Sequence, residues 1–485
     1  MDGFVAVKDF VWDYIVLFVL LGAGLFFTIR LCGVQVKLFH GFKSFKKGKG
    51  KKHDEKGMSS FQALATSVAA QIGTGNLVGA ATAILMGGAG AIFWMWVSGF
   101  LGMATIFAEA TLAQKYKRQI NGEMVGGPIF YIKGAFKGSF GKILACTFSI
   151  LIVIALPIAG NMVQANSIAD AFNTAIPQVP MWGYGIIIVV LAGIIFIGGA
   201  KRIVSFTEKV VPFMALLYLI GAIVVLGFNY KALGGAFHDI FVGAFRPEAV
   251  VGGVAGATVM KAMRYGVARG LFSNEAGMGS TPHAHALAKV NHPCKQGSVA
   301  MLGVFLDTFV VLTITALVIL TSGLVGTTSY EGITLVQEAY RGVFGEFGIY
   351  FIAICLFFFA FSTIIAWYFF GVTNIKYLFG KKAVKYYSVI VLGALMLGAS
   401  LKLEVVWTLS DLMNGLMVIP NAVALIALSN QVAKTYKQYR VLYKKGELDD
   451  YSEPIRQYLS MRDTVEVIVP QNEVIASQTA QNIEE

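Results

Sequence analysis

The sequence contains about eleven apolar runs, each long enough to cross a lipid bilayer as a helix. A bilayer core requires roughly 20 apolar residues per helix. Of the 485 residues, 56% are hydrophobic and only 14% are charged, which is more apolar surface than a soluble core can bury. We therefore predict an all-α integral membrane protein. The runs lie near residues 11–32, 61–86, 89–114, 143–169, 182–200, 210–228, 256–280, 299–321, 348–372, 386–400 and 404–429.

The net charge of +12 is concentrated in loops on one side of these runs. Eight lysines lie between Gly33 and Gly57, and further basic clusters follow the third, fifth and ninth runs. Cytoplasmic loops are enriched in Lys and Arg. We therefore expect a multi-pass protein of the cell membrane, with the N-terminus outside and the C-terminus in the cytoplasm. Membrane topology explains this charge, so no nucleic-acid partner is expected, although Lys46 to Lys52 could also bind lipid headgroups.

The first run lacks the basic flank and the small-residue cleavage site of a signal peptide, so we expect it to remain as a helix. The four cysteines are scattered, without metal or disulfide spacing, and are expected to be packing residues. The end of the chain, which is polar and mixed in charge, is expected to form a cytoplasmic tail.

The second run is interrupted in its middle by the sequence QIGTGN, residues 71–76. Gly73 and Gly75 weaken a helix and let another group approach the backbone closely. Thr74 and Asn76 add polar atoms that are costly in lipid. Glycines can also serve close helix packing, but this combination favours an unwound segment that faces a cavity inside the protein.

The seventh run carries a second interruption, FSNEAGMGS at residues 272–280. Five runs separate the two breaks, and an odd number of crossings reverses the direction of the chain. Two halves with one fold would therefore be inverted relative to each other, which is a plan found in transporters. We expect a peripheral helix with a basic loop, a first repeat, a second repeat and a tail, over residues 1–58, 59–230, 231–431 and 432–485 respectively.

The helix ends at these breaks predict the chemistry of the ligand. The half-helix after Gly75 presents free N–H groups, which suit a carboxylate. The half-helices that end before Gly73 and near Phe272 present free carbonyls, which suit an ammonium group or a sodium ion. A zwitterionic amino acid with a coupling cation is the simplest ligand that satisfies both.

Three motifs resemble the alanine/glycine:cation symporter family: QIGTGNLVGA (71–80), GGAGAIFWMWVSGF (87–100) and GVARGLFSNEAGMGSTPHAHA (266–286). The resemblance covers about residues 11–430. It implies a leucine-transporter-type 5+5 inverted repeat with an extra N-terminal helix, and sodium-coupled import of alanine or glycine by alternating access. His283 departs from the pattern, because a small or apolar residue is expected there. No enzymatic activity and no cofactor are implied; sodium is the expected co-substrate.

The resemblance also implies a substrate site built from four spans. The residues expected to line it are Thr74, Gly75, Asn76, Gln164, Phe272, Ser273 and Asn274. Trp367, one turn beyond Thr363, could form a wall of the pocket or could be a packing aromatic. These two readings stay open at this point.

A sodium site is predicted between the first break and the ninth run. Where the helix stops near Gly73, the carbonyls of Ala69 and Ile72 lose their partners four residues on. The hydroxyls of Ser362 and Thr363 could complete the ligand set, since hard cations prefer oxygen ligands. Such hydroxyls also bond backbone in membrane helices without a function.

Several charged residues lie inside the predicted spans, where charges require partners. Arg264 or Arg269 could pair with Asp411 to form an external gate, although Arg264 and Asp411 could instead reach the interface. Glu109 and Glu275 are further candidates for the gate or its charge network, and Asp307 is a further unusual charge.

Two other functional classes were considered. His283, His285, His292 and Cys294 resemble a metal cluster and raise the alternative of a membrane metalloenzyme, but their spacing matches no known metal motif. A passive channel would also use broken helices, yet two inverted breaks favour alternating access. The sequence does not decide the preferred amino acid and its handedness, sodium against proton, the stoichiometry or the oligomeric state.

Overall fold

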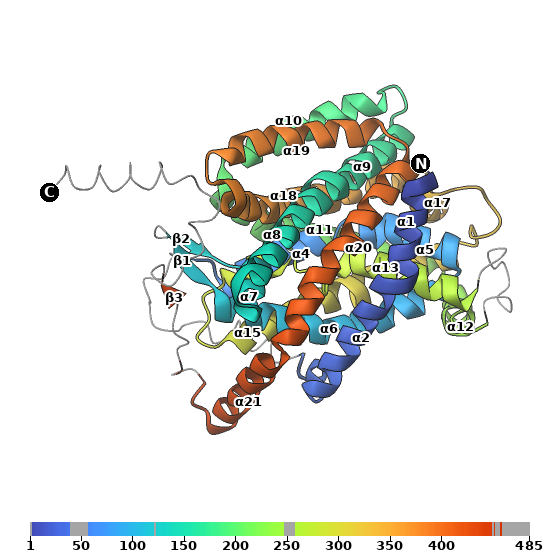
Figure 1. The fold of residues 1–485 in the computed structure, drawn as a ribbon. Helices are drawn as coiled ribbons and strands as arrows, with labels where there is room; N and C mark the ends of the chain where they lie inside the picture. The colour runs from blue at the N-terminus through green and yellow to red at the C-terminus, as the bar shows by residue number, and fades with distance from the viewer. Residues whose placement is uncertain are drawn as a thin grey trace.

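The computed structural model describes residues 2–38, 57–120, 123–246, 258–448, 451 and 456–457, and almost all of this part of the chain is helical (Figure 1). The all-α prediction is confirmed. In chain order the membrane region contains α1 (Asp2–Val11), α2 (Leu17–Arg30), α4 (Ser60–Gln71), α5 (Ala80–Gly87), α6 (Ala91–Tyr116), α8 (Gly138–Ile154), α9 (Asn161–Ala175), α10 (Met181–Ile197), α11 (Gly199–Phe228), α13 (Val259–Asn274), α15 (Pro293–Val304), α16 (Thr313–Thr321), α18 (Glu346–Phe379), α19 (Ala383–Ser400) and α20 (Leu403–Ala427).

Each predicted run overlaps at least one of these helices. Among the described residues, eight continuous helical segments are long and apolar enough to cross a membrane, and the bent pair α4 and α5 makes a ninth. The apolar helix α10 is slightly shorter, with 17 residues. Four spans contain a π-helical turn, in which the backbone locally widens: η1 (Trp12–Val16), η3 (Gly75–Gly79), η4 (Ala155–Gly160) and η7 (Phe305–Leu312).

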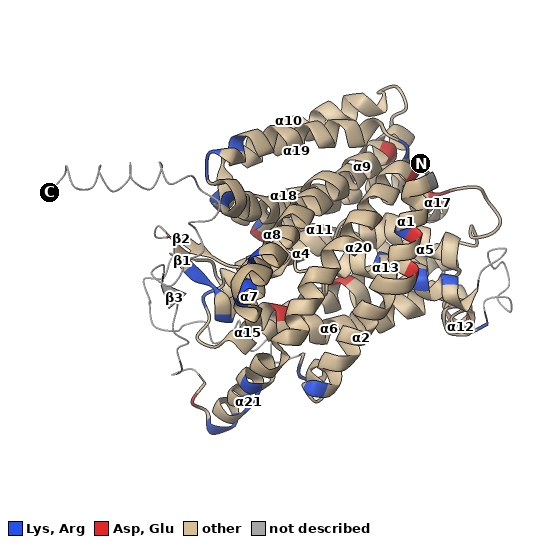
Figure 2. Ribbon diagram, viewed as in Figure 1, with Lys and Arg blue, Asp and Glu red and all other residues tan. Residues whose placement is uncertain are grey.

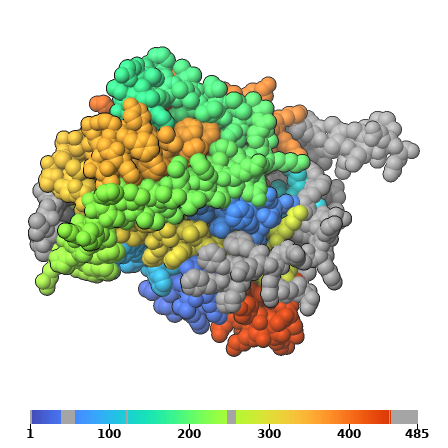
Figure 3. All heavy atoms as spheres, turned by 180° about the vertical axis from the view of Figure 1, so that it is seen from behind, coloured from blue at the N-terminus to red at the C-terminus, as the bar shows by residue number. Residues whose placement is uncertain are grey.

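The spans pack into two groups. In one group, α6 packs against both α13 and α15. In the other, α9 packs against α18 and α19, and α10 lies beside α19 (Figure 1). Helices α4 and α5, on either side of the first break, pack against α15 and α13 of the first group, and the contact of α4 with α18 joins this group to the second. The outer surface is apolar, as lipid requires: in Figure 3 the green segment that contains α11 forms a long ridge, and its side chains Leu216 and Ile223 are 61% and 60% exposed.

Both predicted breaks are present. Helix α4 begins with a capping box at Ser59 and ends at Gln71, and the chain resumes as η3 at Gly75 with a bend of 48° between the two halves. Helix α13 ends at Asn274, two residues later than expected from the sequence, because Glu275 adopts a left-handed conformation with φ of 57°. The loop that follows leads into the short helix α14 (Pro282–Ala286).

Several short elements lie where the sequence analysis expected only loops or a tail. Charged residues concentrate at the ends of the spans and on one of these elements, α21 (Ser429–Lys445) (Figure 2). Strand β1 (Arg118–Ile120) pairs antiparallel with β2 (Glu123–Val125) and parallel with β3 (Arg456–Gln457). Most of the basic loop, residues 39–56, lies outside the described residues. The short elements are η2 (Val34–Lys37), β1 (Arg118–Ile120), β2 (Glu123–Val125), α7 (Pro128–Ala135), η5 (Tyr230–Ala232), α12 (Leu233–Gly243), α17 (Gly332–Phe344), α21 (Ser429–Lys445) and β3 (Arg456–Gln457).

Candidate functional site

The first break is held open by buried side-chain amides. The backbone N–H of Gly73 donates to Oδ1 of Asn76 at 3.0 Å, and the N–H of Thr74 donates to Oε1 of Gln164 at 3.1 Å. Gln164 comes from α9, in the other helix group. These side chains replace the helical partners that the two amides lose at the break, so the unwound backbone is stable inside the protein.

The two glycines allow other spans to approach this backbone. A Cβ atom on Gly73 would collide with the hydroxyl of Thr363 on α18. A Cβ atom on Gly75 would lie 2.9 Å from Cα of Ser273, at the end of α13. The first break therefore contacts both the second break and the ninth span, and glycine is required at these close approaches.

The second break is fixed by Glu275, whose carboxylate is fully buried. Its two oxygens accept hydrogen bonds from Nε1 of Trp367 and from the hydroxyl of Ser280. The neighbouring Asn274 caps the loop through Oδ1, which accepts from the N–H of Ala276 at 3.1 Å, while its own carbonyl accepts from Gln71 at 2.7 Å. The two breaks are thus directly bonded to each other.

Asp307, in η7, joins both breaks. One carboxylate oxygen accepts from Nδ2 of Asn76 and from the hydroxyl of Ser273, both at 2.7 Å, and the other accepts from Thr308 at 2.8 Å. The sequence identified Asp307 only as an unusual intramembrane charge. Its position between the breaks could not be found from the sequence, because the eighth span carries no break of its own.

Four buried polar atoms around the first break have no partner within the described protein: Oε1 of Gln71, Oγ1 of Thr74, Oδ1 of Asn161 and Nε2 of Gln164. Buried polar groups in proteins nearly always find a partner. This set contains both acceptors and donors. A small polar ligand that carries both ammonium and carboxylate groups would satisfy it.

Oxygen atoms from two spans also meet beside the first break. Oγ1 of Thr363 lies 2.9 Å from the carbonyl oxygen of Ala69 and 3.5 Å from that of Ile72. Oγ of Ser362 lies 3.4 Å from the Ala69 carbonyl, and 2.9 Å from that of Phe359 in its own helix. All four residues of the predicted sodium site are therefore adjacent. The atoms that they offer are neutral oxygens, which a hard cation accepts as ligands.

Three aromatic rings lie side by side next to the breaks. The ring of Phe272 lies 5.6 Å from that of Trp367 and 4.6 Å from that of Trp407, between centroids. Trp367 is fully buried and also faces Gly160, where a Cβ atom would collide with the indole. Sequence reasoning missed Trp407, since a tryptophan in an apolar run carries no signal that separates lining from packing.

The candidate outer gate is an ion pair between α13 and α20. Arg269 contacts Asp411 through two hydrogen bonds of 2.7 and 2.9 Å, and its guanidinium lies 4.1 Å above the ring of Trp407. Arg264, the other candidate, instead pairs with Asp9 and Asp13 of the N-terminal span.

Glu109 of α6 holds the loop after the second break. Its oxygens accept from the N–H groups of Gly277 and Gly279 at 3.1 and 2.9 Å, and from Nδ2 of Asn421 at 2.6 Å. Both glycines have positive φ, of 94° and 77°. The carboxylate thus fastens the loop to α6 and to α20.

The histidines near this loop make packing and hydrogen-bond contacts. His283 stacks between Phe148 and Phe370, and its ring nitrogens contact the carbonyl of Ser280 at 2.7 Å and Asn374 at 2.9 Å. In the part of the chain that the structure describes, no three His, Cys, Asp or Glu residues are grouped to hold a metal ion.

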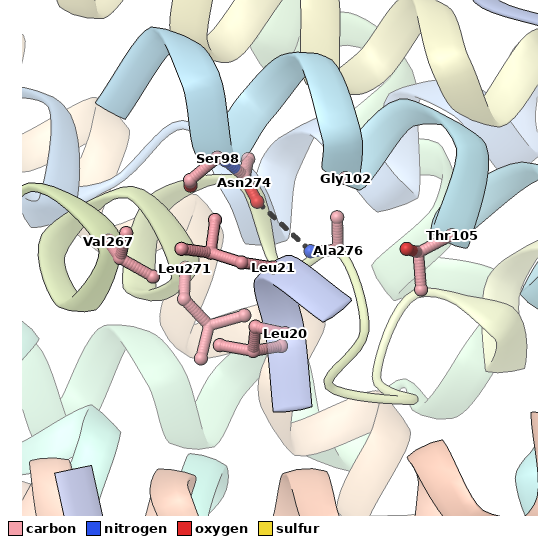
Figure 4. Close-up of a pocket in the computed structure, with 9 residues that line it drawn as sticks. All are labelled: Leu20, Leu21, Ser98, Gly102, Thr105, Val267, Leu271, Asn274 and Ala276. Carbon is pink, nitrogen blue, oxygen red and sulfur yellow. Dashed lines mark hydrogen bonds between the residues drawn. The ribbon is translucent and has the colours of Figure 1, made fainter. Parts of the chain in front are cut away.

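A small pocket lies between α2, α6 and α13 (Figure 4). Asn274 is the one residue that it shares with the predicted substrate site, and its other lining residues come from α2, α6, α13 and the loop after it. Within the described protein, the pocket contains one unpartnered polar atom, Oγ1 of Thr105, whereas the four unpartnered atoms named above lie around the first break. The pocket is lined by Leu20, Leu21, Ser98, Gly102, Thr105, Val267, Leu271, Asn274 and Ala276.

Comparison with solved structures supports the fold. The crystal structure of MhsT in complex with L-phenylalanine matches 80% of this chain and 99% of its own, with a TM-score of 0.53 and 16% sequence identity. The leucine-transporter-type fold is thereby confirmed. At this identity the match concerns the fold alone.

Comparison with known sequences identifies the family. The chain is 41% identical over 440 residues to an uncharacterised transporter of Haemophilus influenzae (90% of this chain, 95% of that one). It is 40% identical to the sodium/alanine symporter AgcS of Methanococcus maripaludis (90% and 97%), and 38% identical to the probable sodium/glutamine symporter GlnT of Bacillus subtilis (91% of both). The model of the sodium:alanine symporter family matches residues 2–453, so the chain belongs to that family.

Proposed function

We propose that this protein imports alanine or glycine together with sodium by alternating access. The observation that carries the proposal is the meeting of two broken spans around buried polar atoms that lack protein partners. The family, and the resemblance to AgcS, named a sodium/alanine symporter, support the same substrate class.

The substrate would bind between the breaks. Its charged groups would contact Thr74, Gly75, Asn76 and Gln164 on one side, and Ser273 and Asn274 on the other. Its side chain would point toward Phe272 and Trp367, with Trp407 behind them. The three close-packed rings would restrict the size of the side chain, which favours alanine or glycine over the glutamine that the name GlnT suggests for that relative.

Sodium would bind at Ala69, Ile72, Ser362 and Thr363. This site lies between the first break and α18, which belong to different helix groups. An ion there would bridge the groups and favour the conformation in which they touch. A ligand shifts a conformational equilibrium only through its different affinities for the two states.

The remaining parts follow the inverted-repeat plan. Residues 59–230 and 231–431 would form the two repeats, residues 1–58 a peripheral helix with its basic loop, and residues 432–485 a cytoplasmic tail. Arg269 and Asp411 would close the outer side, with Glu109 and Glu275 holding the loop of the second break. The N-terminus would lie outside the cell.

The test is uptake of labelled alanine and glycine into proteoliposomes, with sodium and proton gradients imposed separately. We expect accumulation above the external concentration when sodium is higher outside. Liposomes without protein are the control. If the internal amino-acid concentration only reaches the external one, the protein is a channel. If a proton gradient alone drives accumulation, the coupling ion is the proton and not sodium.

A further inference from the structure

A cluster of basic side chains lies where the N-terminal span meets the C-terminal helix α21. Nζ of Lys37 lies 5.4 Å from the centre of the Tyr436 ring, and the guanidinium of Arg440 lies 6.0 Å from the same ring. Arg30, at the end of α2, donates a hydrogen bond to Asn430 in the first turn of α21. Segments about 400 residues apart thus bring their cations to one place.

These cations lack a neutralising carboxylate within the described residues. No ion pair there involves Lys37, Arg440 or Lys444, and α21 contains five Lys or Arg residues without any Asp or Glu. Burial, followed by the charges of Arg440 and Lys444, lowers the pKa of Lys37. Attraction to one tyrosine ring is modest at an exposed site. The cluster is therefore poised to accept an anion.

The apolar surface beside the cluster indicates which anion. Leu25 and Ile29 on α2 are 52% and 70% exposed, and Val36 in the following turn is 83% exposed. They cover the end of a membrane span, so acyl chains would lie against Leu25 and Ile29 while the cations reach the headgroup level. Clusters of Lys and Arg next to a span attract anionic lipids.

We propose that Lys37, Arg440 and Lys444 form a binding site for the phosphate of an anionic phospholipid at the junction of α2 and α21. Lys37 and Arg440 would contact the phosphate from two sides of Tyr436. The bound lipid would tie α21 to the N-terminal span. This site is independent of the transported substrate and differs in position from the lysine run of residues 46–52.

Helix α21 offers a matched pair of variants. Arg440 and Lys444 lie on the side of Tyr436, because residues four apart share a helix face. Lys434 and Lys445 lie on the opposite side at 3.6 residues per turn. The double variants Arg440→Gln/Lys444→Gln and Lys434→Gln/Lys445→Gln remove the same charge from the same helix. Only the first pair belongs to the proposed site.

The experiment is native mass spectrometry of the full-length protein with phosphatidylglycerol, with phosphatidylcholine of the same chains as the neutral lipid. We expect the parent protein to retain phosphatidylglycerol in preference to phosphatidylcholine. Arg440→Gln/Lys444→Gln should weaken retention by roughly thirtyfold, since each of the two cations contributes about 1 kcal/mol near a charged surface. The Lys434→Gln/Lys445→Gln protein should behave as the parent.

Lys37→Gln supplies a second variant on a different segment and should also weaken retention, so the proposal does not depend on how well the α21 variant folds. Equal losses in both double variants would overturn the site, because the effect would then be diffuse charge. Unchanged retention in Arg440→Gln/Lys444→Gln or in Lys37→Gln would also overturn it. So would equal displacement of the lipid by glycerol phosphate at the same concentration, because the occupant would then be free phosphate.

Discussion

Gln164 and Asn76 are both buried amides beside the first break, but their partners differ. Both functional groups of Asn76 are occupied, by the N–H of Gly73 and by Asp307, whereas Nε2 of Gln164 has no partner in the described protein. Gln164→Leu should therefore weaken alanine binding by about 1.5 to 3 kcal/mol, or more than tenfold. Calorimetric titration with alanine measures this.

Asn76→Leu should behave differently, because it removes the cap of the break itself. We expect a loss of thermal stability without ligand, in addition to weaker binding. Equal alanine affinity in Gln164→Leu and the parent would remove Gln164 from the site. The Tm of Gln164→Leu is the control for its folding.

The proposed sodium site can be tested at Thr363. Its hydroxyl lies 2.9 Å from the carbonyl oxygen of Ala69, so Thr363→Ala should raise the sodium concentration needed for alanine binding. Alanine affinity at saturating sodium should change much less. Thr373→Ala is the matched control, since that hydroxyl bonds only within α18, to Phe369. An unchanged sodium dependence in Thr363→Ala and in Ser362→Ala would place the ion elsewhere.

Trp367 is expected to limit the size of the substrate in the proposed site. Trp367→Ala should admit larger amino acids, since the indole fills the space between Phe272 and Gly160. Competition of unlabelled amino acids against alanine uptake gives the ranking. Trp367→Phe, which keeps a ring but loses the bond to Glu275, separates size from hydrogen bonding. If Trp367→Ala folds and keeps the substrate ranking of the parent, the indole serves only for packing.

At the scale of elements, the N-terminal span is connected to the candidate outer gate. Arg264 of α13 pairs with Asp9 and Asp13 in this span, and Nε1 of Trp12 donates to the carbonyl of Asp411 on α20 at 2.9 Å. The span thus joins the two helices that carry the Arg269–Asp411 pair. Opening of the gate would have to break one of these connections.

Arg264→Gln should therefore favour the open outer gate. The substitution removes both ion pairs of Arg264. The pairs are partly exposed, so each contributes about 1 kcal/mol or less, and a shift of up to roughly thirtyfold is expected. The measurement is the labelling rate of a cysteine introduced at the buried Thr408, in a background without native cysteines, by an impermeant reagent on the N-terminal side. Lys8→Gln, which alters a neighbour of Asp9 without touching α13, is the control. Faster labelling in Arg269→Gln but not in Arg264→Gln would contradict the connection.

At the scale of the whole molecule, the proposed orientation of the protein in the membrane can be tested with a cysteine of the native sequence. Cys32 is exposed just after α2, at the opposite end of the N-terminal span from the chain start. With the N-terminus outside, an impermeant maleimide should leave Cys32 unlabelled in intact cells and label it in inside-out vesicles. The Cys32→Ser variant is the control, because the labelling that it loses is the labelling of Cys32. Labelling in intact cells would reverse the orientation.

The sequence by itself determined the fold class and the positions of both breaks. Apolar runs of membrane length leave the chain no other solvent, and polar residues with glycine inside such runs are tolerated only at an unwound segment. Those signals are local, so they could be read along the chain. Thr74 and Asn76 were singled out in this way, whereas the roles predicted for Ser273, Ser362 and Thr363 came with the resemblance to the family.

Only the tertiary structure decided which distant groups meet. Asp411 pairs with Arg269 rather than Arg264, Asp307 joins both breaks, and Trp407 covers Phe272, because the packing of different spans, 34 to 231 residues apart in the chain, sets these contacts. The short helices α7, α12 and α17 also escaped detection, since they are too brief for a membrane-length signal. Local sequence determines where a membrane helix must break, whereas partner choice depends on which spans the fold brings together.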